Sequence, residues 1–171
     1  TLEDDKARVN LQKAFKRMDD IIKELATVEK LTSENRLVYK EITSFFHIYN
    51  KTLEITMVTP ENISSKINDF TFEVDVHMFS IALKNLIDNA IKFSPNKKAM
   101  INATKKEIII SSLGKPLKHE LEYYTEPFCQ EEKRSDGFGL GLYIVKTIVN
   151  LHNYKLDYYY KDEMNNFVIK M

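Results

Sequence analysis

Hydrophobic residues dominate one helical stretch near the middle of the chain, residues 79–93. On a helix at about 100° per residue, they cover most of the circumference and leave one polar stripe about 100° wide. The stripe consists of Asn85, Asp88, Asn89 and Lys92. A helix this apolar should be largely buried, so the stripe either faces solvent or lines a site. From this stretch alone, a solvated face is the better supported interpretation, because polar stripes usually face water.

A second helical pattern runs from about residue 6 to residue 33. Its apolar residues are spaced 4, 3, 4 and 3 apart, and they are Leu11, Phe15, Met18, Ile22 and Leu25. This heptad seam is typical of a coiled coil or helix bundle. A core helix of the same domain is the alternative. Residues 32–35 break the pattern and indicate a linker or the entry to a strand.

Shorter patterns predict the remaining elements. Helices are expected over 36–49 and 143–152, and Asp75 should cap the helix that contains residues 79–93. Alternation predicts strands over 53–58, 70–74, 100–104, 107–111, 156–160 and 167–171. The 107–111 run is apolar enough for an interior strand. Residues 60–62 indicate a turn, and residues 117–136 are polar and irregular.

Composition narrows the function classes. The 171 residues contain 25 Lys plus Arg and 25 Asp plus Glu, a net charge of zero that provides no basic surface for nucleic acid or an anionic membrane. The single cysteine, Cys129, cannot form an internal disulfide and fits a reducing compartment. No apolar run reaches membrane-spanning length, and no signal peptide is evident. The chain begins without Met, so we expect a fragment of a longer protein.

Glycine is scarce and clustered. Three of the four glycines lie within residues 137–141, directly before a predicted helix. Glycines at a helix N-terminus allow close backbone approach and present N–H groups to an anion. The G-x-G-x-G spacing matches neither the dinucleotide fingerprint nor the P-loop, and a flexible hinge is an alternative. Asn oxygens suit Mg²⁺ and Lys92 suits phosphate, so the polar stripe and the glycines together indicate a phosphate site.

Three segments resemble motifs of sensor histidine kinases. Residues 86–94, preceded by Asn85, resemble the N box; residues 137–146 resemble the G2 box; and residues 126–128 resemble the F box. The resemblance covers about residues 6–171. It implies an α+β fold, the two-layer Bergerat ATP-binding sandwich, in which a mixed, mostly antiparallel sheet carries helices on one face and ATP lies under a mobile lid. Residues 1–34 would be the second helix of the dimerisation and phosphoacceptor hairpin, and residues 35–171 the catalytic domain.

The resemblance also implies roles for individual residues. Asn89 would bind Mg²⁺, Lys92 would contact phosphate, and Phe93 would line the nucleotide site. The phosphates would be wrapped by the backbone of Gly137, Phe138, Gly139, Leu140, Gly141 and Leu142. Further ATP-binding positions would be Asn85, Ser112, Gly114, Phe128 and Arg134. Asn85 stands where related ATPases carry a water-activating Glu; an amide cannot act as that base, which favours phosphoryl transfer to protein over hydrolysis.

The G1 box departs from the family pattern. The family usually reads D-x-G-x-G, whereas this chain has Ser112 in place of Asp and Pro116 in place of the second Gly. The Asp accepts a hydrogen bond from the adenine amine, and losing such a charged bond costs about 1.5–3 kcal/mol. We therefore expect weaker or less selective adenine binding, measurable by comparing ATP with GTP. Equal affinity in a Ser112→Asp variant would contradict this.

The phosphoacceptor His is expected upstream of Thr1. His119 and the two residues after it superficially resemble the acceptor motif but lie in the lid region, and His47, His77 and His152 have ordinary helical contexts without metal-ligand spacing. The fragment should therefore bind Mg·ATP without phosphorylating itself.

The whole protein would transfer the γ-phosphoryl group to a His on the missing hairpin helix, for relay to a response regulator Asp. It would act as a homodimer, with the fragment cytoplasmic and the parent anchored in the bacterial inner membrane. One alternative is a catalytically degenerate nucleotide-binding or regulatory module. Another is a serine kinase of the same fold, against which the heptad helix argues.

Overall fold

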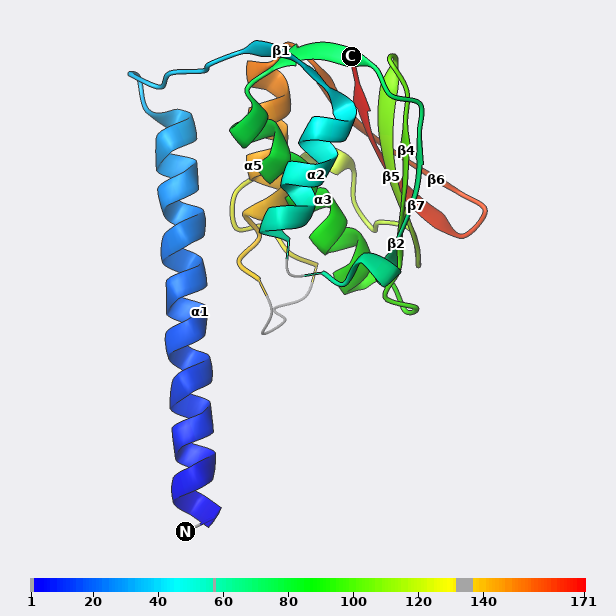
Figure 1. The fold of residues 1–171 in the computed structure, drawn as a ribbon. Helices are drawn as coiled ribbons and strands as arrows, with labels where there is room; N and C mark the ends of the chain where they lie inside the picture. Colours follow the sequence, from blue (N-terminus) through cyan, green and yellow to red (C-terminus); the bar gives the residue numbers. More distant parts are fainter. Residues whose placement is uncertain (1, 57, 132–136) are drawn as a thin grey trace. The chain divides into compact units, whose positions relative to one another are not determined.

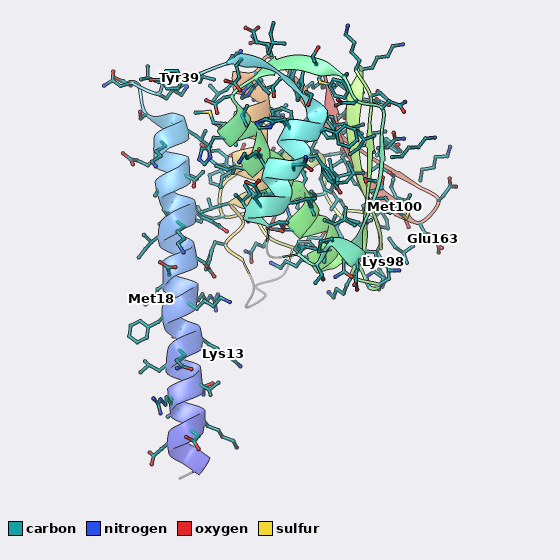
Figure 2. All side chains as sticks on the ribbon, viewed as in Figure 1. Lys13, Met18, Tyr39, Lys98, Met100 and Glu163 are labelled. Atoms are coloured by element: carbon teal, nitrogen blue, oxygen red, sulfur yellow. The ribbon has the colours of Figure 1, made fainter. Side chains whose placement is uncertain are left out.

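The computed structural model describes residues 2–56, 58–131 and 137–171. The chain divides into two compact units, Thr1–Arg36 and Leu37–Met171. The first unit contains one long helix, α1 (Leu2–Thr32), which confirms the predicted N-terminal helix. Its heptad seam is exposed to solvent, with Met18 56% exposed and Ile22 62% exposed (Figure 2). None of the helices described is long and apolar enough to cross a membrane.

The second unit is built on a five-stranded sheet with the order β2-β4-β5-β7-β6. Only β2 and β4 pair in parallel; the other neighbours are antiparallel. The strands are β2 (Ile63–Ile67), β4 (Ala99–Ala103), β5 (Glu107–Leu113), β6 (Lys155–Lys161) and β7 (Met164–Lys170). A separate two-stranded ribbon pairs β1 (Glu41–Ser44) with β3 (Thr71–Val74).

Helices cover one face of the large sheet, as Figure 1 shows. They are α2 (Phe45–Ile55), α3 (Val76–Phe93) and α5 (Gly141–Leu151), and the connections add η1 (Pro60–Asn62) and α4 (Leu121–Tyr124). The mixed, mostly antiparallel sheet with helices on one face is the α+β arrangement that the sequence predicts. The interior position expected for the 107–111 strand is also confirmed, because β5 lies between β4 and β7.

The core lies between this sheet and α3 and α5. Along β5, Ile108, Ile110 and Ser112 are buried and alternate with partly exposed residues, so one face of the strand meets the helices. Leu83 and Leu86 of α3 are fully buried against that layer. The opposite face of the sheet is open to solvent, as the half-exposed Met100 illustrates (Figure 2).

In the first third of the second unit, two predicted elements are wrong and one strand was missed. Residues 41–44 form strand β1 instead of helix, because they pair with β3. Helix α2 begins only at Phe45, and its N-cap is Ser44, whose hydroxyl accepts a hydrogen bond from the His47 N–H. The strand expected over 53–58 is wrong, because α2 continues to Ile55. Strand β2 was not expected; its Ser-Ser-Lys centre is polar because it lies at the edge of the sheet.

Candidate functional site

Helix α3 carries the polar stripe, and the residues at both ends of the helix fix where it begins and ends. The Asp75 carboxylate accepts a hydrogen bond from the Met78 N–H at 3.0 Å, so Asp75 is the N-cap, as predicted. The helix ends at Phe93, and its C-cap Ser94 precedes Pro95. Because its apolar faces are buried on both flanks, α3 holds the side chains of Asn85, Asn89 and Lys92 in a fixed, half-buried row.

Asn89 lies beside the N-terminus of α5. A β carbon on Gly141 would stand 3.6 Å from Asn89 Nδ2 and 3.9 Å from Asn89 Oδ1. Leu140, the N-cap of α5, makes no side-chain capping bond, so the first N–H groups of the helix lack that partner. A carboxamide and helix N–H groups therefore meet at one point, which suits an anion with an accompanying hard cation.

Lys92 approaches the glycine loop at Gly137. A β carbon there would come within 2.7 Å of Lys92 Nζ, and the φ angle of Gly137 is +116°. At Gly139, φ is +71° and a β carbon would lie 2.6 Å from the carbonyl oxygen of Cys129. Close contacts and positive φ angles thus explain why both positions are glycine, and a simple hinge would require neither feature.

The F-box segment packs directly on this loop. The Phe128 N–H donates to the Gly139 carbonyl oxygen at 3.0 Å. Phe128 adopts a positive φ of 65°, and its side chain is 65% exposed. A bulky residue seldom takes this conformation, which here places the chain against Gly139.

The end of α3 reaches the G1 loop. The Phe93 carbonyl oxygen would lie 3.9 Å from a β carbon on Gly114. The Phe93 ring is 58% exposed, and Lys92 Nζ stands 5.1 Å from the centre of that ring. Ser112 is buried on the helix-facing side of β5. The predicted N-box, G1 and G2 residues are therefore brought together around one site.

Asp88 does not share this surface with its neighbours in the stripe. Its carboxylate forms an ion pair with Lys84 at 2.7 Å and accepts a hydrogen bond from the Thr56 hydroxyl at 2.9 Å. Thr56 is the C-cap of α2, so Asp88 links α2 to α3. In contrast, within the described ranges the carboxamides of Asn85 and Asn89 hydrogen-bond to no other group of the protein.

The other predicted ATP-binding positions differ in how exposed they are. Leu140 is 1% exposed, so only its backbone is available to a ligand. Phe138 and Leu142 are half-buried in the loop and in the first turn of α5. Arg134 lies outside the described residues.

A hydrogen-bonded network around the G1 loop was not predicted from the sequence. Asn165 Nδ2 donates to the Lys115 carbonyl oxygen at 3.0 Å, and the Tyr158 hydroxyl donates to Asn165 Oδ1 at 2.7 Å. The same hydroxyl accepts from the Leu117 N–H at 3.2 Å. These residues come from β6 and β7, so only the strand register could have revealed them.

A second network anchors the segment after the G1 loop. The Tyr124 hydroxyl donates to the Glu131 carboxylate and accepts from the Lys118 N–H. Burial and the bond to Glu131 raise the pKa of Tyr124 to about 12, so the phenol stays neutral. The ring of His119 packs against Tyr123, with ring centres 4.5 Å apart.

Comparison with known proteins places this geometry in a family. The family model for the histidine kinase-, DNA gyrase B- and HSP90-like ATPases matches residues 74–170, from the end of β3 to the end of β7. The chain belongs to this family. The matched range contains the N-box helix, the G1 loop and the glycine loop.

Relatives of this histidine kinase-like ATPase domain are sensor kinases. The sensor histidine kinase ArsS of Helicobacter pylori is 32% identical over 162 residues, which cover 91% of this chain and 38% of ArsS. The probable sensor kinase SilS of Salmonella typhimurium is 31% identical over 91 residues, covering 47% of this chain and 18% of SilS. The chain thus spans well under half of the length of these relatives.

Solved structures share the fold of this ATPase domain. The Acinetobacter baumannii histidine kinase AdeS superimposes with a TM-score of 0.70 at 19% identity, covering 95% of this chain and 81% of that chain. The mycobacterial sensor histidine kinase MprB gives a TM-score of 0.63 at 23% identity, covering 75% of this chain and 95% of that chain.

Proposed function

We propose that this chain is the catalytic part of a sensor histidine kinase, which binds Mg·ATP and transfers its γ-phosphoryl group to a histidine. The observation that carries the proposal is the convergence of Asn89 and Lys92 of α3 on Gly141 and Gly137 of the glycine loop. Membership of the histidine kinase-like ATPase family supports it.

The residues present fit a magnesium-bound nucleotide. Asn89 offers a neutral oxygen to Mg²⁺ without repelling phosphate, and Lys92 offers a positive charge. The uncapped start of α5 and the glycines before it offer N–H groups at close range. Bound Mg·ATP supplies the transferable phosphoryl group together with a cation that neutralises phosphate charge.

Asn85 favours transfer to protein over hydrolysis. It lies one helical turn before Asn89, half-buried on the same stripe. Its amide forms hydrogen bonds but takes up no proton at neutral pH, so it would position the reactants without activating water. The site would therefore work by orientation and charge neutralisation, with the nucleophile supplied by a separate histidine.

The test is thermal unfolding with Mg·ADP and Mg·ATP. A ligand at about 100 times its dissociation constant stabilises the folded protein by about 2.7 kcal/mol. We expect a magnesium-dependent rise in the unfolding midpoint that is lost in Asn89→Ala. Asn102→Ala is the matched control, because Asn102 is an exposed carboxamide on β4. A nucleotide-dependent rise that persists unchanged in folded Asn89→Ala would contradict the assignment of Asn89.

The altered G1 box supports a second candidate, a regulatory module that has lost catalysis. Ser112 replaces a carboxylate, and Pro116 stiffens a loop that β6 and β7 already hold. No midpoint shift at millimolar nucleotide would favour this candidate. A serine kinase of the same fold is the third possibility, and the long heptad helix α1 counts against it.

We further propose that residues 1–34 are the second helix of the dimerisation and phosphoacceptor hairpin. The exposed heptad seam of α1 supports this, because such a seam packs against other helices in a bundle. The acceptor His would lie upstream, the parent would be a homodimer anchored in the bacterial inner membrane, and this part would face the cytoplasm. A response regulator would receive the phosphoryl group.

A further inference from the structure

The β6–β7 hairpin brings the carboxamide of Asn165 to the G1 loop. In the register of β5 and β7, Asn165 lies directly opposite Ser112. Directly paired residues of antiparallel strands project on the same face, so both side chains belong to the helix-facing side of the sheet. Ser112 stands where the family pattern has the carboxylate that reads adenine.

Gly114 makes room for this carboxamide. A β carbon on Gly114 would lie 3.1 Å from Asn165 Nδ2, which is closer than an ordinary contact. The same β carbon would lie 3.9 Å from the carbonyl oxygen of Phe93, at the end of α3. Asn165 therefore stands at the junction of the G1 loop and the N-box helix, and Lys92 and the glycine loop mark the phosphate end of the site.

The amide of Asn165 is held in one orientation with bonding capacity to spare. Oδ1 accepts from the Tyr158 hydroxyl, and Nδ2 donates to the Lys115 carbonyl oxygen. A carboxamide has two N–H donors and two acceptor lone pairs, so one N–H and one lone pair remain. Because both bonds to the protein fix the group in place, the remaining pair has a defined direction before any ligand binds.

We propose that Asn165 is a specificity-determining residue that reads the purine edge of the nucleotide in place of the carboxylate missing at Ser112. This inference rests on the proposed nucleotide site. Adenine presents an amine donor beside a ring-nitrogen acceptor, whereas guanine presents a carbonyl acceptor beside an N–H donor. A carboxylate that faces the purine 6-position only accepts, so it pairs with the adenine amine and repels the guanine carbonyl, whereas a carboxamide complements either group. The site accordingly accepts both purines, with less than about tenfold discrimination.

The test is direct titration of the full chain with Mg·ADP, Mg·GDP and magnesium tripolyphosphate, which lacks a base. In Asn165→Asp we expect the affinity ratio of Mg·ADP to Mg·GDP to rise by about tenfold or more, because the carboxylate repels the guanine carbonyl. In Asn165→Ser, a small neutral change, affinity for both nucleotides should fall by about tenfold while tripolyphosphate binding is unchanged. Asn102→Asp, on the open face of the sheet, is the control and should leave the ratio unchanged.

The outcomes separate this inference from the proposed function. Wild-type protein that binds Mg·ADP, with an unchanged purine ratio in folded Asn165→Asp, overturns the role of Asn165 and leaves the nucleotide site standing. If Asn165→Asp does not fold, Asn165→Ser decides: equal losses for nucleotides and tripolyphosphate would show that Asn165 only shapes the loop. Wild-type protein that binds no nucleotide would overturn both proposals together.

Discussion

His152 joins two helices and a strand end through one buried imidazole. Its Nε2 accepts a hydrogen bond from the Asp75 N–H at 2.9 Å, and its Nδ1 lies 2.7 Å from the Ile148 carbonyl oxygen. Because Nε2 must accept, the proton of the neutral ring belongs on Nδ1. The side chain is 3% exposed and packs edge-on against Phe79. A proton on Nε2 would remove the acceptor and turn two N–H groups toward one another.

This contact predicts a loss of stability on acidification. Burial lowers the pKa of His152 below its ordinary value, with nearby Lys40 acting in the same direction; the Ile148 carbonyl and Asp75 oppose the shift. The unfolded chain therefore takes up the proton first, near pH 6.5. The contribution of neutral His152 to the free energy of unfolding should be fully present above that pH. Below it, the free energy of unfolding should fall by at most about 1.4 kcal/mol per pH unit.

Urea unfolding between pH 5 and 7.5 measures this effect. His152→Gln should be less stable at pH 7.5 and should show a flatter dependence on pH. His47→Gln, at an exposed position of α2, is the matched control and should retain the wild-type slope. An unchanged slope in His152→Gln would show that other groups cause the acid sensitivity.

Among the elements, the β6–β7 hairpin combines a strained turn with a backbone contact to the G1 loop. Asp162 and Glu163 have φ angles of 51° and 59°, as a two-residue hairpin turn of the primed type requires. Glycine is the usual residue there, because in this conformation the β carbon of any other residue comes too close to a backbone carbonyl oxygen. The Glu163 carbonyl oxygen nevertheless accepts the Gly114 N–H at 3.0 Å, so this hydrogen bond holds the turn against the G1 loop.

Replacing Glu163 with glycine should therefore stabilise the protein. The left-handed conformation costs a side-chain-bearing residue about 1 kcal/mol, partly offset by the greater freedom of glycine in the unfolded chain. We expect Glu163→Gly to raise the free energy of unfolding by about 0.5 kcal/mol, measured by urea titration. Lys161→Gly, at the end of β6 where φ is not positive, should lower it. A destabilised Glu163→Gly would mean that the glutamate side chain makes a contribution larger than the strain.

The same elements show what sequence could and could not predict. Helix α3 and the glycine loop were predicted because their signals are local: a helical period, a capping Asp75, and three glycines clustered in a chain that has only one other. Strands β1 and β2 were missed because short edge strands are defined by their partners, β3 and β4. Asn165 was missed because its place beside Gly114 depends on strand register between segments 50 residues apart.

Taken together, the molecule divides its proposed tasks between two units. Every described candidate site residue lies in Leu37–Met171, whereas the exposed heptad seam lies in Thr1–Arg36. A unit with its own core can be supplied separately in solution, and here nearly all buried apolar residues lie in Leu37–Met171. A kinase with this division can receive its acceptor histidine from another chain.

Phosphorylation in trans tests that division. Alone, this chain should incorporate no phosphate from labelled Mg·ATP. Adding a folded helical hairpin that carries the acceptor histidine should yield acid-labile phosphate on the hairpin, and Asn89→Ala should abolish it. A hairpin in which that histidine is replaced by Gln is the control. Continued failure with a folded hairpin and bound nucleotide would contradict the kinase assignment.

The packing of residue 129 against Gly139 has a practical consequence for spectroscopy. Cys129 is the single cysteine of the chain, its side chain is partly exposed, and its backbone touches the glycine loop. A thiol-reactive fluorophore would therefore attach at one known position, beside the loop proposed to hold the phosphates. The native cysteine thus serves as a labelling site, so no engineered cysteine is needed. Changes in the emission of the attached fluorophore would follow ligand exchange in real time.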